Sequence, residues 1–105
     1  DVFLNIAGGI RVEEPALDLA ICASLVSSLH DIPISEKVCF AAEVGLGGEI
    51  RAVNRIESRI SEAQKLGYEV IYISTYNTKG LDQKKFDIMI KPYAKLASVF
   101  SDLMG

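Results

Sequence analysis

Short runs rich in β-branched and aromatic residues alternate along this chain with longer segments of helical periodicity. A strand repeats its side-chain direction every two residues and a helix about every 3.6, so each run can be assigned from its period and from the glycine or proline that flanks it. The alternation predicts a single domain of mixed α/β (α+β) class. We expect strands at residues 2–6, 10–13, 38–44, 49–53, 69–74 and 86–90, and helices at residues 15–30, 54–66 and 92–104.

The first expected helix, residues 15–30, is apolar over most of its length. Pro15 loses nothing at a first helical position, and the acids Glu13, Glu14 and Asp18 complement the positive end of the helix dipole. Leucine, isoleucine, valine and cysteine then recur on nearly every side of the helix instead of along one stripe. We therefore expect a core helix that is packed on most of its sides.

A glycine-rich turn, "GLGG" at residues 45–48, separates two β-rich runs. It does not match GxGxxG, it lacks the Lys-Ser/Thr pair of a P-loop, and a strand follows it instead of the helix N-terminus that would hold a phosphate. The pattern favours a plain hairpin between residues 38–44 and 49–53. Another turn, Gly8-Gly9, is expected between the first two strands.

The second expected helix opens with the sequence "NRIESRI". Asn54 is followed three residues later by Glu57, the spacing of a capping box, in which each side chain bonds a backbone N–H of the first turn. Gly67 follows the last periodic residue, where a left-handed C-cap favours glycine. We interpret Glu57 as part of a helix cap, with a contact to a neighbouring subunit as the alternative.

Composition excludes several classes of function. The chain has 105 residues, of which 50% are hydrophobic, and this suffices for one compact domain with a modest core. Its longest apolar run, residues 16–26, is shorter than the ~20 residues of a membrane span. A net charge of −3 argues against binding nucleic acid or anionic membrane by bulk charge, so any such binding needs a local patch. We expect a cytoplasmic piece of a longer protein, since the chain starts at Asp1 with no signal-peptide pattern.

Cysteine and histidine do not form a recognisable metal or catalytic motif. Cys22 and Cys39 lie inside apolar runs without CxxC or Cys/His spacing, so we interpret them as buried free thiols. His30, the single histidine, falls at the end of a helix, where a cation suits the dipole. A catalytic role for His30 would need a nucleophile and an orienting acid beside it.

Three stretches carry a resemblance to a known family. The segments "DVFLNIAGGIRVEEPALDLAICASLVSSL", "AEVGLGGEIRAVNRIESRISEAQKLG" and "VIYIS" resemble the carboxy-terminal Lon-protease-like domain of the bacterial RadA/Sms DNA repair family, over residues 1 to about 74. The resemblance implies the fold of the Lon proteolytic domain, related to the second domain of ribosomal protein S5. It also implies that residues 1–105 are one partial domain, truncated at its N-terminal side. The family's zinc-finger and RecA-like ATPase parts, which hold zinc, ATP and magnesium, would then lie outside it, and no cofactor is expected within it.

Lon itself uses a catalytic serine in "PKDGPSAG" and a catalytic lysine in "LPIGGLKEK". The resemblance places Ala16 of "RVEEPALD" at the serine position and Glu57 of "RAVNRIESR" at the lysine position. Alanine has no nucleophile, and a carboxylate cannot replace the amine base of a Ser-Lys pair. We expect no enzyme activity from this chain. A Lon-type serine peptidase remains the alternative, and it would need Ser58 or Ser24 with Lys37.

Basic residues cluster in the second half of the hairpin and in the helix after it. Arg51, Arg55 and Arg59 recur every four residues, so Arg55 and Arg59 are expected on one side of the helix. Lys65 and Arg11 complete the candidate DNA-binding set, and the alternative is a solvated charged face. The resemblance implies a hexameric ring that drives branch migration, with this domain as assembly platform and contact surface for single-stranded or branched DNA.

Overall fold

The computed structural model describes residues 14–105 of the chain. The strands expected at 2–6 and 10–13, the turn at Gly8-Gly9 and the candidate residue Arg11 therefore lie outside the described residues. The described elements follow in this order: η1 (Pro15–Leu17), α2 (Asp18–His30), β1 (Val38–Ala41), β2 (Glu43–Val44), β3 (Ile50–Arg51), α3 (Ile56–Lys65), β4 (Val70–Ser74), η2 (Thr75–Asn77), η3 (Gln83–Lys85), β5 (Met89–Tyr93) and α4 (Leu96–Met104).

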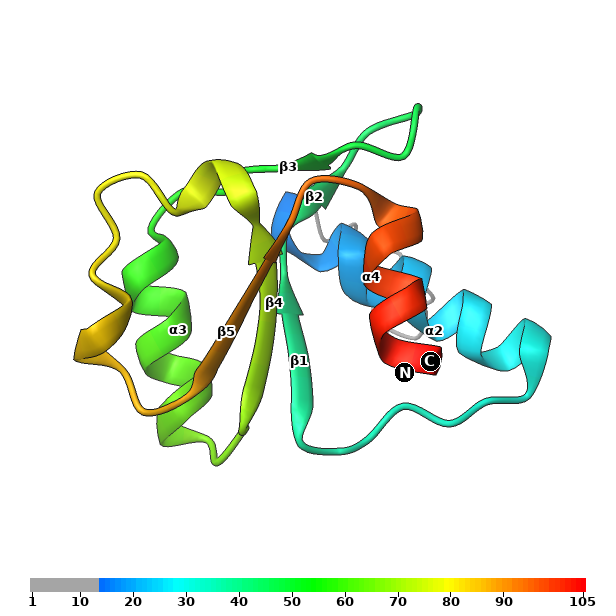
Figure 1. The fold of residues 1–105 in the computed structure, drawn as a ribbon, viewed down its shortest axis with the longest axis horizontal. Helices are drawn as coiled ribbons and strands as arrows, with labels where there is room; N and C mark the ends of the chain where they lie inside the picture. The colour runs from blue at the N-terminus through cyan, green and yellow to red at the C-terminus, as the bar shows by residue number, and fades with distance from the viewer. Residues whose placement is uncertain (1–13) are drawn as a thin grey trace, which may run out of the picture.

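A parallel sheet of order β1-β4-β5 forms the centre of the described fold. Helix α3 covers one face of the sheet, and α2 and α4 lie on the other (Figure 1). Parallel strands need crossover connections, and helices in those connections cover the sheet faces. The mixed α/β class predicted from the sequence is thus confirmed.

The sequence "VIYIS" of β4 explains how one strand serves two cores. Ile71 and Ile73 pack against Ile60 and Ala63 of α3, whereas Tyr72 points to the opposite face with Leu19 and Val99, which come from α2 and α4. Because β4 is the middle strand and both of its faces are covered, its residues 70–73 form a continuous hydrophobic run instead of alternating with polar residues.

Helix α2 is less enclosed than the sequence predicts. Only Leu19 and Ala23 are buried, and Leu25 and Leu29 are 53% and 79% exposed. The prediction that this helix is packed on most of its sides is wrong for the described fold. The three-stranded sheet offers a partner to one side of the helix only, so the remaining apolar residues stay accessible.

The run at residues 38–44 does not form one strand of a hairpin. β1 pairs in parallel with β4, while β2 pairs antiparallel with β3, so the predicted hairpin is correct only for its tip. Ala42 separates the two strands because its backbone bonds elsewhere: its N–H donates to Ala16 O at 3.3 Å, and its carbonyl accepts from Leu19 N at 3.1 Å. These bonds fix η1 and the start of α2 beside β1.

The C-terminal elements begin later than predicted. The last strand is Met89–Tyr93 instead of 86–90, and the last helix begins at Leu96 instead of Pro92. Pro92 lies inside β5, at the edge of the described sheet, where the missing N–H of proline is tolerated.

Candidate functional site

A cavity of about 570 Å³ lies between η1, β1 and α3. Its walls include alanines from all three elements: Ala16, Ala41 and Ala63. Because these side chains are short, they leave a hollow between the three elements. Leu66 and Tyr68, which follow α3, also line it.

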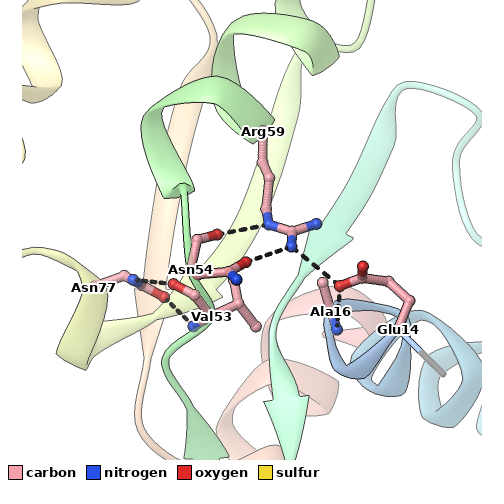
Figure 2. Close-up of polar contacts among 6 residues, drawn as sticks. All are labelled: Glu14, Ala16, Val53, Asn54, Arg59 and Asn77. Carbon is pink, nitrogen blue, oxygen red and sulfur yellow. Dashed lines mark hydrogen bonds and ion pairs between the residues drawn. The ribbon is translucent and has the colours of Figure 1, made fainter.

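The mouth of the cavity carries an ion pair between elements that are far apart in sequence. Arg59 on α3 donates to Glu14 Oε1 at 3.0 Å, and the side chain of Arg59 is only 24% exposed. The same guanidinium donates from Nε to the backbone oxygen of Asn54 and from Nη2 to Asn54 Oδ1, each at 2.8 Å (Figure 2). Glu14 Oε1 also accepts from the Ala16 N–H at 3.2 Å. Arg59 therefore ties the start of α3 to η1.

The segment before α3 is held from its other side by Asn77. The Asn77 amide accepts from Val53 N at 2.9 Å and donates to Val53 O at 3.0 Å (Figure 2). One side chain thus replaces a backbone partner for both polar groups of Val53. The sequence gives little sign of either contact, because Glu14 and Arg59 are 45 residues apart and Asn77 and Val53 are 24 apart.

The capping box predicted for α3 is wrong. The N-cap position is Arg55, with φ 51° and ψ 45°, and no side chain caps the helix. A capping side chain folds back from an extended backbone, and the left-handed turn at Arg55 removes that geometry. Asn54 binds Arg59 instead, and Glu57 pairs with Lys85 at 3.1 Å.

The C-terminal cap of α3 is confirmed. Gly67 has φ 94°, its N–H donates to Gln64 O, and the N–H of Tyr68 donates to Ala63 O. These two bonds form a Schellman motif.

The two positions that resemble a degenerate catalytic dyad lie in different surroundings. Ala16 is 4% exposed and lines the cavity. Glu57 is exposed, pairs with Lys85, and is not among the residues that line the cavity.

The serines and the lysine of the peptidase alternative are not gathered at one site. Ser58 lines the cavity, Ser24 lies exposed on α2, and Lys37 pairs with Glu69 at 4.0 Å. Among the described residues that line the cavity there is neither a lysine nor a histidine to serve as a base.

Both cysteines are free and half-buried, whereas the sequence predicts full burial. Cys39 lies in the cavity wall and its Sγ donates to Val70 O at 3.5 Å. Burial raises the pKa of the Cys39 thiol to about 11, so little thiolate is present at neutral pH. Burial, and then the nearby Asp18, raises the pKa of Cys22.

The predicted DNA-binding residues fall into two kinds. Arg51 pairs with Glu49 at 2.8 Å and with Glu43 at 3.6 Å, and Arg59 pairs with Glu14. The hydrogen bond from Arg51 is the main reason that the pKa of Glu49 is lowered.

Arg55 and Lys65 have no acidic partner within 4.0 Å among residues 14–105. The structure brings Arg55 and Arg59 to the same cavity, while Arg51 lies on β3 and Lys65 at the end of α3.

The described fold bears on metal binding and on membrane insertion. No group of three or more histidine, cysteine, aspartate or glutamate side chains within residues 14–105 is placed to hold a metal ion. Over the same stretch, none of the helices has both the length and the apolar character needed to cross a membrane. His30 lies exposed in the last turn of α2, at the position predicted from the sequence.

Comparison with known proteins gives a family and a group of relatives. The family model described as subunit ChlI of Mg-chelatase matches residues 1–77. The chain is 47% identical over 85 residues to the DNA repair protein RadA of Streptococcus pneumoniae, covering 81% of this chain and 20% of the relative. It is 47% identical to RadA of Bacillus subtilis (81% and 19%) and 49% identical to RadA of Listeria monocytogenes (73% and 17%). The chain spans about a fifth of the length of these relatives.

Proposed function

The chain belongs to the family described as subunit ChlI of Mg-chelatase, and we propose that it is the non-catalytic, Lon-like domain of a DNA repair and recombination ATPase. The observation that carries this proposal is the 47% identity to a DNA repair protein over 81% of the chain. In the proposed protein a hexameric ring drives branch migration of recombination intermediates in the cytoplasm. This domain would serve as a platform for ring assembly and as a contact surface for single-stranded or branched DNA. ATP, magnesium and zinc would be bound by domains outside these residues.

The absence of chemistry in this domain is supported by the lining of the cavity. Ala16 lies in the cavity wall, where it can supply no nucleophile. Ser58 is there, but no lysine or histidine stands among the described lining residues to take its proton. The cavity is therefore better suited to binding a ligand than to hydrolysing one.

The proposed DNA contact rests chiefly on Arg55 and Lys65. A basic residue strengthens DNA binding when it displaces condensed cations from the phosphates. Arg51 and Arg59 must first leave their carboxylates, so their contribution should be smaller. Arg11 remains in the proposed set.

The proposed assembly role is supported by the apolar surface of α2. Leu25 and Leu29 are the most exposed leucines of that helix, and Ile21 and Cys22 continue the same stripe at helical spacing. Exposed apolar patches of this kind mark interaction surfaces. We expect multi-angle light scattering to show self-association of the chain, and a strict monomer at high concentration would count against the assembly role.

A chimaera tests the DNA contact. This chain replaces the matching segment of the Bacillus subtilis relative, and binding to single-stranded and branched DNA is titrated with salt. Arg55→Ala and Lys65→Ala should each lower the slope of log affinity against log salt by about 0.7–0.9. Arg51→Ala is the matched control, and it should change the slope less, because Glu49 already neutralises Arg51.

Folding by circular dichroism and ATP hydrolysis should be unchanged in all three variants, since exposed arginines and lysines contribute little to stability. Wild-type slopes in every variant would remove DNA contact from the proposed function and leave assembly alone.

A Lon-type Ser-Lys peptidase is the second candidate, favoured only by Ser58 in the cavity wall. A fluorescent casein assay and a serine-reactive probe test it. Turnover or labelling above a buffer blank would favour the peptidase over the non-catalytic domain.

A further inference from the structure

The cavity between η1, β1 and α3 has an apolar wall that no described side chain fills. Its volume of about 570 Å³ falls within the ~300–1,000 Å³ typical of ligand sites. Cys39 and Ile71 come from the strands, and Ala63 and Leu66 from α3 and its end. Leu66 is 67% exposed, so one side of the cavity presents hydrocarbon to solvent. Such a wall suits an aliphatic or aromatic side chain of a ligand.

The mouth of this cavity carries two arginines and two glutamates, of which one pair is in contact. Arg59 and Glu14 neutralise each other at 3.0 Å. Arg55 has no acidic partner among residues 14–105, and Ser58 lines the cavity with it. A guanidinium binds a carboxylate through two parallel N–H donors, so the rim at Arg55 suits a single carboxylate.

The backbone of Arg55 adds a second, independent sign of function. Its φ of 51° lies in the left-handed region, where a side chain with a Cβ costs about 1 kcal/mol or more. Residues held in such conformations cluster at functional sites, where the surrounding structure holds the strain. We take the left-handed backbone of Arg55 as a second reason to look for a ligand at this rim.

We propose that this cavity binds the free carboxyl terminus of a partner peptide whose last side chain is apolar. The peptide carboxylate binds Arg55, and its last side chain packs against the apolar wall of the cavity. The peptide then runs along α3 toward Glu62, which also lines the cavity. Arg55 and Glu62 are seven residues apart, or about 10.5 Å along a helix. That length is close to three residues of extended peptide, at about 3.3 Å each. A basic side chain three residues before the carboxyl terminus would then meet Glu62.

A nucleic acid is a poorer fit to the same cavity. Glu14 and Glu62 stand on the rim together with the two arginines, so the rim has no net positive charge. A polyanion would meet the Glu62 carboxylate beside Arg55, whereas a peptide with one terminal carboxylate and an upstream base meets both signs. The peptide site shares Arg55 with the proposed DNA contact, so the two ligands would compete for that side chain.

The probe is a fluorescein-labelled hexapeptide, Gly-Gly-Lys-Ser-Gly-Leu, with a free carboxyl terminus. Its binding to the 105-residue chain is measured by fluorescence anisotropy. The same peptide with a carboxyl-terminal amide should bind at least ~10-fold more weakly, because the charge-assisted bonds to Arg55 are lost. Arg55→Gln should weaken the free-carboxylate peptide by a similar factor, and it should leave the amide unaffected.

Two further variants separate the cavity from the rim. Ala63→Leu places three more carbons in the cavity and should abolish binding of both peptides. Lys84→Gln is the matched control for Arg55→Gln: it removes a charge from η3, outside the cavity, and should leave affinity unchanged. Circular dichroism checks that each variant folds.

Amide chemical shifts of the wild-type chain on titration with the free-carboxylate peptide map the site without any variant. Changes should centre on Ala41, Ser58 and Ala63. Equal affinity for the acid and the amide would overturn the proposal, as would shifts confined to other residues or no binding at all. A 5′-phosphorylated oligonucleotide is titrated in parallel. If it binds at Arg55 in both wild type and Ala63→Leu, and the peptide does not bind wild type, then Arg55 contacts phosphate only. The proposed peptide site is then wrong.

Discussion

The left-handed backbone at Arg55 predicts an inverted order of stability between glycine and alanine. At an ordinary exposed helix position, glycine is about 1 kcal/mol less stable than alanine. At φ 51°, alanine keeps a strain of roughly 1–2 kcal/mol that glycine relieves, while glycine adds about 0.5–1 kcal/mol of conformational entropy to the unfolded state. Arg55→Gly should therefore be about 0.5–1 kcal/mol more stable than Arg55→Ala.

Urea unfolding and thermal melts of four variants test this order. Glu62 is the matched control, because it is exposed in the middle of α3, where glycine should be the less stable residue. The glycine–alanine difference should change sign between positions 55 and 62. The two differences should be about 1.5–2 kcal/mol apart, or about 6–8 °C in Tm for a domain of this size.

The result also decides between two starts for α3. If Asn54 were the N-cap, as the capping-box pattern predicts, Arg55 would be a right-handed first-turn residue. Arg55→Gly would then be less stable than Arg55→Ala, as at Glu62. That outcome would refute the left-handed geometry and restore the pairing of Asn54 with Glu57.

Three further predictions concern separate parts of the fold. Asp102→Ala should destabilise the chain by about 1 kcal/mol at pH 7, because the buried Tyr72 hydroxyl, which donates to Asp102 at 2.5 Å, loses its acceptor. The hydrogen bond from Tyr72, followed by one from Lys91, lowers the pKa of Asp102. Its stabilisation is therefore present above about pH 4 and lost as pH falls through the lowered pKa, so thermal melts of the two proteins should converge in acid. Gly67→Ala should lower stability by about 1 kcal/mol in urea unfolding, since φ 94° disfavours a Cβ, and an unchanged midpoint would contradict the Schellman cap. Ala16→Ser combined with Glu57→Lys should not cleave casein, because the side chain at position 57 lies outside the lining of the cavity; robust turnover would show that the two positions do meet.

The parts of the fold that could be predicted depend on local periodicity. The apolar run of β4, the amphipathic pattern of α3 and the glycine at 67 each act over a few residues, and all three are placed correctly. The split of the run at 38–44 depends on Ala42, whose backbone bonds to Ala16 and Leu19. The residue pattern within 38–44 cannot indicate these partners, because they lie more than twenty residues away in the sequence.

The candidate site was predictable only in its composition. The sequence singles out Arg55 and Arg59 by their spacing, and the structure places both at one cavity. The sequence does not show that Arg59 pairs with Glu14, because the two residues are 45 positions apart. Glu14 fits equally well as an acid that complements the dipole of the helix that follows it. The capping-box error has the same origin: Asn54 fits the local pattern, but a guanidinium on the next turn competes for its side chain.

The Arg59–Glu14 pair joins α3 to the start of η1, and both elements line the cavity. Glu14 accepts hydrogen bonds from both Arg59 and the Ala16 N–H. The carboxylate that neutralises the charge of Arg59 therefore also caps η1. A phosphate that recruited Arg59 would have to break this pair and thereby loosen η1, which forms one wall of the cavity. Arg55 can accept an anion without that cost. An anion therefore binds this face with the smallest loss of existing contacts at Arg55. The Arg59–Glu14 ion pair stays intact and holds the cavity walls in place while that contact forms.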